Sequence, residues 1–253
     1  AARNTGIRAA GGEFVAFLDD DDEWHPEKLA KQVACMQAGP AELGLVYTGF
    51  RKVLPNTGEV KTLIPEPGGH ELPRLLARNT IGTTSLVMCR RQALLEVGMF
   101  DALPARQDID LYVRMAQRYS LDFVPEVLVT WYRHESDAVG KSVSRAIEAP
   151  RLFFEKQGEI IRKYPQAESE RLFELAKRLN ELGEYSAARA AFVRSASLDR
   201  RRWWAYGYAL MSNAPSHRVV AGSRGARHGL KRTLNSGVRT VLSSGRDLRR
   251  KST

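Results

Sequence analysis

The sequence predicts an α/β fold followed by a helical region and a basic carboxyl-terminal tail. In residues 1–145, β-prone apolar runs alternate with helix-forming segments. In residues 146–215, apolar residues recur at spacings of three and four, and residues 216–253 are rich in Arg and Lys. A chain of 253 residues is long enough for one sizeable core plus an appendage.

The first expected strand covers residues 13–18, where the apolar run Phe14–Leu18 lies. Pro26 suits the first turn of a helix at 26–38, and a strand follows at 44–50. Pro55-Asn56-Thr57-Gly58 supplies the turn of a hairpin. The remaining expected elements are a helix at 71–78, a strand at 84–89, helices at 91–97 and 108–118, and a strand at 127–133. This alternation predicts a sheet with parallel pairs.

The helical region 146–215 contains a pair of helices with a clear break between them. Leu172, Leu175 and Leu179 lie on one side of Gly183, and Ala188 and Phe192 continue the apolar spacing on the other. The pair resembles a single tetratricopeptide helical hairpin.

Four consecutive carboxylates, Asp19–Asp22, end the first apolar strand. In α/β sheets, ligands bind beyond the carboxyl ends of strands, so this tract is a candidate site. If the strand continues, Asp19 and Asp21 point the same way and offer oxygen ligands to Mg²⁺ or Mn²⁺, which can hold a diphosphate. A solvated acidic loop is the alternative. An EF-hand is excluded because Trp24 stands where its loop requires Gly.

The segment Ala2–Leu29, from Ala-Arg-Asn-Thr-Gly through the Asp tract to His-Pro-Glu-Lys-Leu, resembles the central part of family-2 glycosyltransferases. These are inverting enzymes with the A-type nucleotide-sugar fold. The resemblance implies an Asp-x-Asp motif at Asp19 and Asp21, with Asp21 the direct metal ligand. It also implies that the nucleotide lies near Arg3, Asn4, Asp19 and Asp20.

A second block, Gly98–Asp101 with Gln107–Ala116, is similar to the family's Gly-Gly-Phe-Asp and Glu-Asp-x-Asp-Leu-x-x-Arg motifs. The resemblance implies that Asp108 is the catalytic base. Two positions depart from the family pattern: Met99 replaces a Gly and Gln107 replaces the usual Glu. Taken alone, Asp108 could instead be a carboxylate favoured by the dipole at a helix start.

Two further sites follow from the same resemblance, and His25 is a candidate because it lies beside the acidic tract. His134, after the strand at 127–133, matches a family position that can approach the metal or the diphosphate, so it is a candidate third ligand. His25 is a weaker candidate because His-Pro suits a helix start. The segment Ile81–Ser85 corresponds to residues that shape the acceptor site, and its structural alternative is an ordinary turn before a strand.

The resemblance begins in the middle of the family's domain, so the first strand–helix units of the A-type sheet are expected to be missing by amino-terminal truncation. The expected domains are a partial catalytic domain at 1–145, a helical region at 146–215 and a tail at 216–253. Cys35 and Cys89 are far apart in sequence, and no run is apolar enough for a spanning helix. These features favour a cytoplasmic protein, with peripheral attachment to the cytoplasmic face of a membrane as an option.

The implied function is metal-assisted, inverting transfer of a sugar, with a UDP-sugar the favoured donor and a saccharide or lipid-linked acceptor, in polysaccharide or glycoconjugate synthesis. The altered Gln107 and the missing first units leave open a non-catalytic module or a basic-tailed interaction protein.

The tail carries most of the net charge. Ten Lys and Arg residues against Asp247 give residues 216–253 a formal charge of +9, while residues 1–215 carry +1. Leu230, Leu234 and Val238 recur at helical spacing among the basic residues. An anionic membrane surface is the expected partner. A disordered basic tail is an alternative. Nucleic acid is disfavoured because no aromatic residues lie among the charges.

Overall fold

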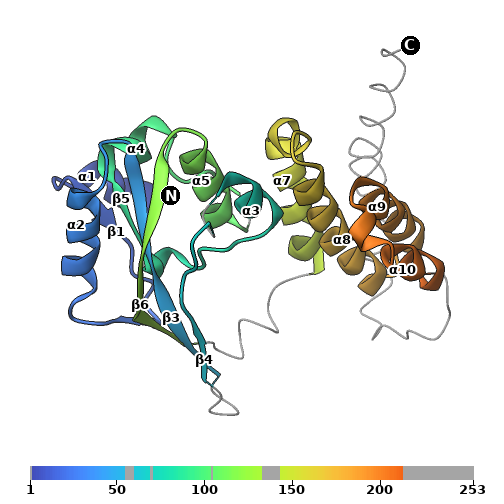
Figure 1. The fold of residues 1–253 in the computed structure, drawn as a ribbon, viewed down its shortest axis with the longest axis horizontal. Coiled ribbons are helices and arrows are strands. Elements are labelled where there is room, and N and C mark those ends of the chain that lie inside the picture. Colours follow the sequence, from blue (N-terminus) through green and yellow to red (C-terminus); the bar gives the residue numbers. More distant parts are fainter. Residues whose placement is uncertain (1, 55–59, 69–70, 104, 133–142, 213–253) are drawn as a thin grey trace. The chain divides into compact units, whose positions relative to one another are not determined.

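The computed structural model describes residues 2–54, 60–68, 71–103, 105–132 and 143–212. The chain divides into two compact units, Ala1–Lys141 and Ser142–Thr253 (Figure 1). The predicted tail and His134 lie outside the described residues.

A mixed sheet forms the centre of the first unit. Its strands follow the order β1 (Phe14–Ala16), β5 (Val87–Arg90), β3 (Leu43–Val53), β6 (Ser120–Tyr132) and β2 (Asp22–Trp24), and β4 (Val60–Leu63) pairs with β3. Strands β3 and β6 are parallel, and the other described pairs are antiparallel. The predicted α/β class is therefore confirmed. The antiparallel pairing of β3 with β4 agrees with the predicted hairpin, whose turn at 55–58 lies outside the described residues.

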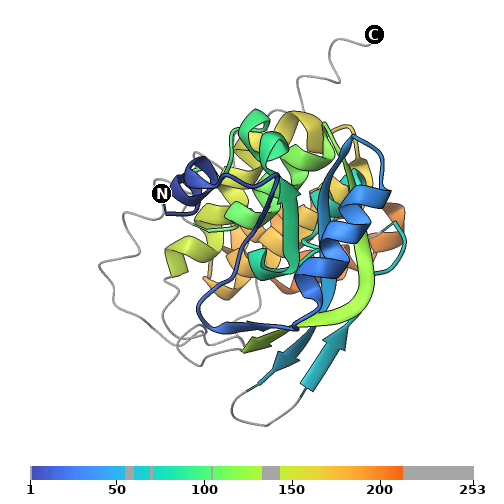
Figure 2. The same cartoon turned by 90° about the vertical axis from the view of Figure 1, so that its left-hand side faces the viewer.

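Helices cover both faces of this sheet. Helix α2 (Lys28–Ala38) lies across one face, and α5 (Gln107–Ala116) and α3 (Leu72–Ala77) lie on the other (Figure 1). Figure 2 shows the α2 side of the same unit. Helices α1 (Ala2–Ala9) and α4 (Arg91–Glu96) contact each other. Because each covering helix presents an apolar stripe to the sheet, the core forms in two layers.

The core beneath α2 joins Met36 to side chains of β3, β5 and β6, namely Leu43, Val46, Met88, Val124 and Leu128. Lys28 is fully buried, and its Nζ donates a 2.6 Å hydrogen bond to Oε1 of Gln32. Gln32 in turn donates to the carbonyl oxygens of Val46 and Leu86, at 2.9 and 3.0 Å. Burial lowers the pKa of Lys28 to about 7, and the neighbouring Cys89 opposes this fall.

Several local predictions differ from the structure. Strand β6 (Ser120–Tyr132) begins seven residues before the strand predicted at 127–133, and β2 (Asp22–Trp24) was not predicted. The strand predicted at 13–18 ends at Ala16. The strand predicted at 84–89 is wrong for residues 84–86, which form the 3-10 turn η1 (Thr84–Leu86), because the Leu86 N–H donates to the Thr83 carbonyl at 3.2 Å. Helix α1 was not predicted, since its apolar pattern is weak and Ile7 is its buried residue.

The second unit is helical. It contains α7 (Val143–Ile161), α8 (Pro165–Glu181), α9 (Tyr185–Leu198), η2 (Arg200–Arg202) and α10 (Ala205–Met211). Gly183 adopts φ +77° between α8 and α9, a conformation that favours glycine at a helix end. Ser169 near the start of α8 hydrogen-bonds Ser195 near the end of α9, so the two helices form an antiparallel hairpin. Among the described residues, no helix is both long and apolar enough to span a membrane.

Candidate active site

The acidic tract is a tight turn between β1 and β2. The Asp22 N–H donates to the Asp19 carbonyl at 3.1 Å, which closes the turn. The strand therefore does not continue through the tract, and the predicted alternation of Asp19 and Asp21 along a strand is wrong. Asp20 is exposed, Asp19 and Asp21 are partly buried, and Asp22 is buried.

Asp19 is held from three sides. The Arg3 guanidinium donates to its Oδ1 at 2.7 Å, and the Thr84 hydroxyl lies 3.2 Å from its Oδ2. Its backbone N–H donates to the Ser85 hydroxyl at 3.0 Å. The turn thus has a fixed position against η1, and Arg3 pairs with one carboxylate oxygen of Asp19, Oδ1.

Asp22 is a buried carboxylate with an unusual environment. It is 8% exposed, and neither carboxylate oxygen has a hydrogen-bond partner among the described residues. Burial raises the pKa of Asp22 to about 6, and the charges of Asp21 and Asp19 raise it further. Ser85 and the Tyr132 backbone lie close enough to lower this pKa, without reaching hydrogen-bonding geometry. Unpaired carboxylate oxygens beside two other carboxylates are the kind of donors that Mg²⁺ and Mn²⁺ prefer.

These carboxylates do not make a complete metal site by themselves. The described part of the chain has no cluster of three or more His, Cys, Asp or Glu side chains arranged around one point. The donor type fits a hard divalent cation, but further ligands would have to come from elsewhere. His134, the predicted third ligand, falls outside the described residues.

Asp108 lies in the first turn of α5. The Asn79 Nδ2 donates to Oδ2 of Asp108 at 2.8 Å and to the Gly82 carbonyl at 2.9 Å. Burial raises the pKa of Asp108, whereas the backbone amides at the helix start and the charges of Arg106 and Arg3 lower it. A carboxylate with a raised pKa and a defined orientation is suited to accepting a proton.

The segment 79–85 links Asp108 to the acidic turn. Its Asn79 end holds Asp108, and its Thr84 and Ser85 end holds Asp19. Between them, the Thr83 carbonyl accepts a 3.2 Å hydrogen bond from the buried Tyr112 hydroxyl. Burial raises the pKa of Tyr112 well above its usual value, and the charges of both Asp108 and Asp19 add to this rise. The two carboxylates therefore lie around the same tyrosine, with Arg3 near both.

The other predicted site residues make contacts that support the fold. The Asn4 Nδ2 donates to the Phe100 carbonyl at 2.7 Å, and the Asn4 Oδ1 accepts from the Phe100 N–H at 3.0 Å. Asn4 therefore connects α1 to the loop before α5. His25 is exposed, and its Nδ1 accepts from the Glu27 N–H at 3.3 Å. A hollow of about 310 Å³ beside His25 is lined by residues 23–26, Arg51 and residues 127–130, and by none of the predicted carboxylates.

The two departures from the family pattern have visible consequences. Met99 adopts φ +61°, a left-handed conformation that favours the Gly it replaces. Its carbonyl accepts a 2.7 Å hydrogen bond from Arg114, which also pairs with the buried Asp110 at 2.8 Å. Gln107 donates to the Leu103 carbonyl at 2.7 Å and thereby supports the start of α5.

The sequence analysis missed Asn79 and Asp22. An Asn two residues before Ile81-Gly82 is a common turn signal, and its Oδ1 indeed accepts from the backbone N–H groups of Ile81 and Gly82. Its contact with Asp108, 29 residues away, has no local signal. In the sequence, Asp22 is one of four consecutive carboxylates, and only the pairing of β2 with β6 distinguishes it as the buried one.

Comparison with known proteins finds similarity to glycosyltransferases. The family described as Glycosyl transferase family 2 matches residues 1–102. The amylovoran biosynthesis glycosyltransferase AmsB of Erwinia amylovora is 29% identical over 49% of this chain and 42% of its own length. The Escherichia coli enzyme WfgD, a UDP-Glc:alpha-D-GlcNAc-diphosphoundecaprenol beta-1,3-glucosyltransferase, is 32% identical over 35% of this chain and 34% of its own length.

A crystal structure of S. aureus TarS 1–349 in complex with UDP aligns with a TM-score of 0.43 at 15% identity, over 87% of this chain and 73% of that one. The chain spans less than half the length of the curated relatives it matches. The acidic turn and residues 79–85 lie within the matched residues, and residues 1–102 are similar to glycosyl transferase family 2.

Proposed function

We propose that the first unit is part of a glycosyltransferase that moves a sugar from a nucleotide-sugar donor to an acceptor hydroxyl with inversion. The supporting observation is the position of Arg3, which pairs with Asp19 at 2.7 Å and whose charge also lowers the pKa of Asp108. One cation thus lies close to both carboxylates. The proposed donor site at the acidic turn and the proposed base belong to the same small region.

On the donor side, Asp21 and Asp19 would bind Mg²⁺ or Mn²⁺, with Asp22 beside them and Asp20 and Arg3 near the nucleotide. A bound divalent ion would supply positive charge for the departing diphosphate. The chain's own contribution is the position of Asp19, which Arg3, Thr84 and Ser85 hold in place. His134 keeps its proposed role as a further ligand.

On the acceptor side, Asp108 would act as the general base. The acceptor oxygen attacks the anomeric carbon from the face opposite the diphosphate and forms a new carbon–oxygen bond. The carbon–oxygen bond to the phosphate breaks, and its electron pair leaves with the nucleoside diphosphate. The acceptor proton passes to a carboxylate oxygen of Asp108. The segment Ile81–Ser85, which lies between the two carboxylates, would contact the acceptor.

The names of the relatives support the proposed substrate class. WfgD uses UDP-Glc and a diphosphoundecaprenol-linked acceptor, and AmsB takes part in amylovoran biosynthesis. We therefore favour a UDP-sugar donor, a saccharide or lipid-linked acceptor, and a role in cell-envelope polysaccharide synthesis at the cytoplasmic face of the membrane.

The test uses the full-length protein. Purified protein is incubated with Mn²⁺ and a panel of UDP-sugars and acceptors, and the anomeric configuration of the product is read by NMR. Asp108→Asn should lower kcat by about 10²–10⁴-fold, because the amide cannot take the proton. UDP affinity, measured by calorimetry, should not change.

The result separates the enzyme from the non-catalytic alternative. A wild-type protein that binds UDP but transfers no sugar from any donor would favour a non-catalytic module. An Asp108→Asn protein with normal turnover would refute the assignment of the base.

A further inference from the structure

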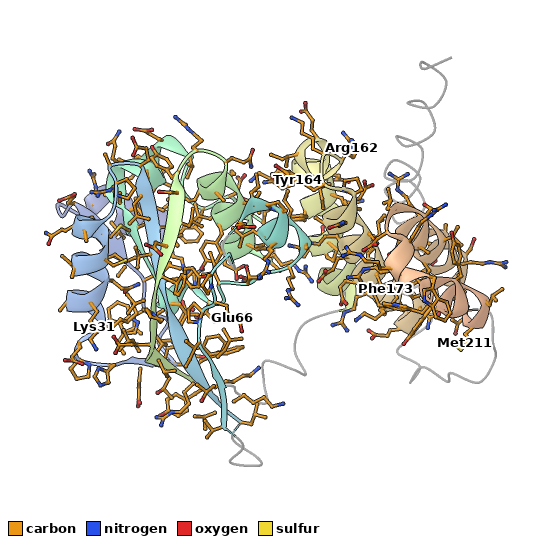
Figure 3. The ribbon with its side chains drawn as sticks, viewed as in Figure 1. Lys31, Glu66, Arg162, Tyr164, Phe173 and Met211 are labelled. Atoms are coloured by element: carbon orange, nitrogen blue, oxygen red, sulfur yellow. The ribbon has the colours of Figure 1, made fainter. Side chains whose placement is uncertain are left out.

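Helix α10, at the end of the described chain, is uncharged along its whole length. Its inner side is well packed: Ala205 and Ala209 are buried, and Tyr208 places its ring 5.4 Å from that of Phe173. Trp204, just before the helix, lies 4.7 Å from the same ring in an edge-to-face contact. Figure 3 labels Phe173 and, at the end of α10, Met211. The inner side of α10 thus provides its packing onto the second unit.

The other side of α10 is also apolar. Trp203 and Leu210 are each 71% exposed, Met211 is 54% exposed and Tyr206 is 46% exposed. Tyr206 and Leu210 are four residues apart and share one side of the helix, and Trp203, which precedes α10, has helical backbone angles and lies three residues before Tyr206. We call these four residues the outer face of α10. A surface helix normally presents polar residues on the side away from its core, and an exposed apolar patch usually marks a contact surface.

Basic residues flank the outer face at both ends. Arg200 to Arg202 precede it; Arg201 pairs with Asp199 and Arg202 with Glu170, both at 3.0 Å, whereas the exposed Arg200 has no ion pair with the described residues. After Met211 the sequence enters residues 216–253, whose formal charge is +9. In the sequence, the aromatic and aliphatic residues of the outer face thus stand between Arg200–Arg202 and the basic residues of 216–253.

We propose that the outer face of α10 docks on an anionic phospholipid surface. Trp and Tyr rings favour the boundary between headgroups and acyl chains, Leu and Met side chains can enter the acyl region, and the flanking Arg and Lys residues are attracted to anionic headgroups. A second copy of the chain fits less well, because each copy would bring another basic segment to the same interface. The inference does not depend on the proposed sugar transfer.

This surface adds an apolar component to the electrostatic attachment expected of the tail. Salt shortens the range of charge–charge attraction, whereas apolar insertion persists at high ionic strength. The two contributions can therefore be separated by the salt concentration.

The test measures sedimentation of the full chain with vesicles of phosphatidylcholine and 30% phosphatidylglycerol, at low salt and at 0.5 M NaCl. The variant Trp203→Ser/Leu210→Ser removes two exposed side chains, and Leu63→Ser/Ile64→Ser is the matched control, because Leu63 and Ile64 are 46% and 52% exposed. We expect the wild type and the control to keep binding at 0.5 M NaCl, and the α10 variant to bind at least fivefold less. Thermal melting checks that all three proteins are equally folded.

Quenching by lipids brominated in their acyl chains gives a second measurement: Trp fluorescence should be quenched in the wild type and much less in the α10 variant. Equal sedimentation of the α10 variant and the wild type at 0.5 M NaCl would overturn the proposal, as would failure of the wild type to bind these vesicles. A monomer–dimer equilibrium in ultracentrifugation that the α10 variant abolishes, without vesicle binding, would assign the outer face to a second copy instead.

Discussion

Asn79 donates a 2.8 Å hydrogen bond to Oδ2 of Asp108 while its Oδ1 accepts the backbone N–H groups of Ile81 and Gly82. One amide therefore shapes the turn before η1 and orients the proposed base. A change at Asn79 should therefore affect catalysis by altering the position and the pKa of Asp108. The same turn continues into Thr84 and Ser85, which hold Asp19.

We expect Asn79→Asp to shift the acidic limb of the kcat/KM profile to higher pH. The substitution keeps an acceptor for the two N–H groups but replaces the donor to Asp108 with a second negative charge, which raises the pKa of Asp108. A hydrogen bond to a charged group contributes about 1.5–3 kcal/mol, so the shift should be on the order of one pH unit or more. The measurement is a pH–rate profile of the full-length protein. An unchanged acidic limb would show that Asn79 has only a structural role.

We expect Asp21→Asn to weaken Mn²⁺-dependent UDP binding at least tenfold, because the amide loses the charge that a hard cation requires. Titration calorimetry with and without EDTA measures the effect. Glu27→Gln is the control, since Glu27 lies on the exposed surface after the acidic turn and pairs with Lys31. Equal losses in both variants would argue against a specific metal ligand at Asp21.

We expect Gly82→Ala to destabilise the protein by about 2 kcal/mol or more and to lower activity. Gly82 adopts φ +113°, and an added Cβ would lie 2.6 Å from a Leu86 methyl group. Gly6→Ala is the matched control. It lies in α1 with nothing within 4 Å of the added Cβ, so the same substitution should stabilise α1 by about 0.5–1 kcal/mol. Chemical denaturation followed by circular dichroism measures both values, and equal effects at the two sites would contradict the prediction.

We expect the free energy of unfolding to depend on pH through Lys28. Its pKa is about 7 in the folded protein and near 10.5 when unfolded, so between these values the unfolded state binds more protons and stability rises with pH. At about 1.4 kcal/mol per pH unit over the difference of about 3.5 pH units, the full contribution is on the order of 5 kcal/mol.

In Lys28→Met this contribution is absent. The free energy of unfolding of the variant should therefore exceed that of the wild type by the largest amount near pH 7. This difference should shrink as the pH approaches 10.5. Urea denaturation at a series of pH values measures it. Lys31→Met, at a partly exposed position on the same helix, should show no such trend. A parallel pH dependence in Lys28→Met and the wild type would mean that Lys28 keeps its charge in the core.

Much of this protein could be predicted from local sequence. The helix after Pro26, the hairpin near Asn56, the helix start at Asp108 and the break at Gly183 each depend on residues within a few positions of one another. Helical spacing, turn residues and terminal residues act over such short ranges, so the elements and the approximate place of the candidate site could be found without a structure. The family resemblance then assigned roles to Asp19, Asp21 and Asp108, which remain proposals.

The tertiary structure decided how those residues are used. Arg3 meets Asp19 across 16 positions, and Thr84 meets Asp19 across 65. Asp22 is buried because β2 pairs with β6, where Asp22 lies opposite Trp131. Contacts between such distant residues depend on which strands pair and in which register, and no local pattern encodes that register. The sequence by itself therefore determined the elements and the carboxylates. The folded sheet determined which carboxylate is held, which is buried with no hydrogen-bond partner among the described residues, and which is oriented by Asn79.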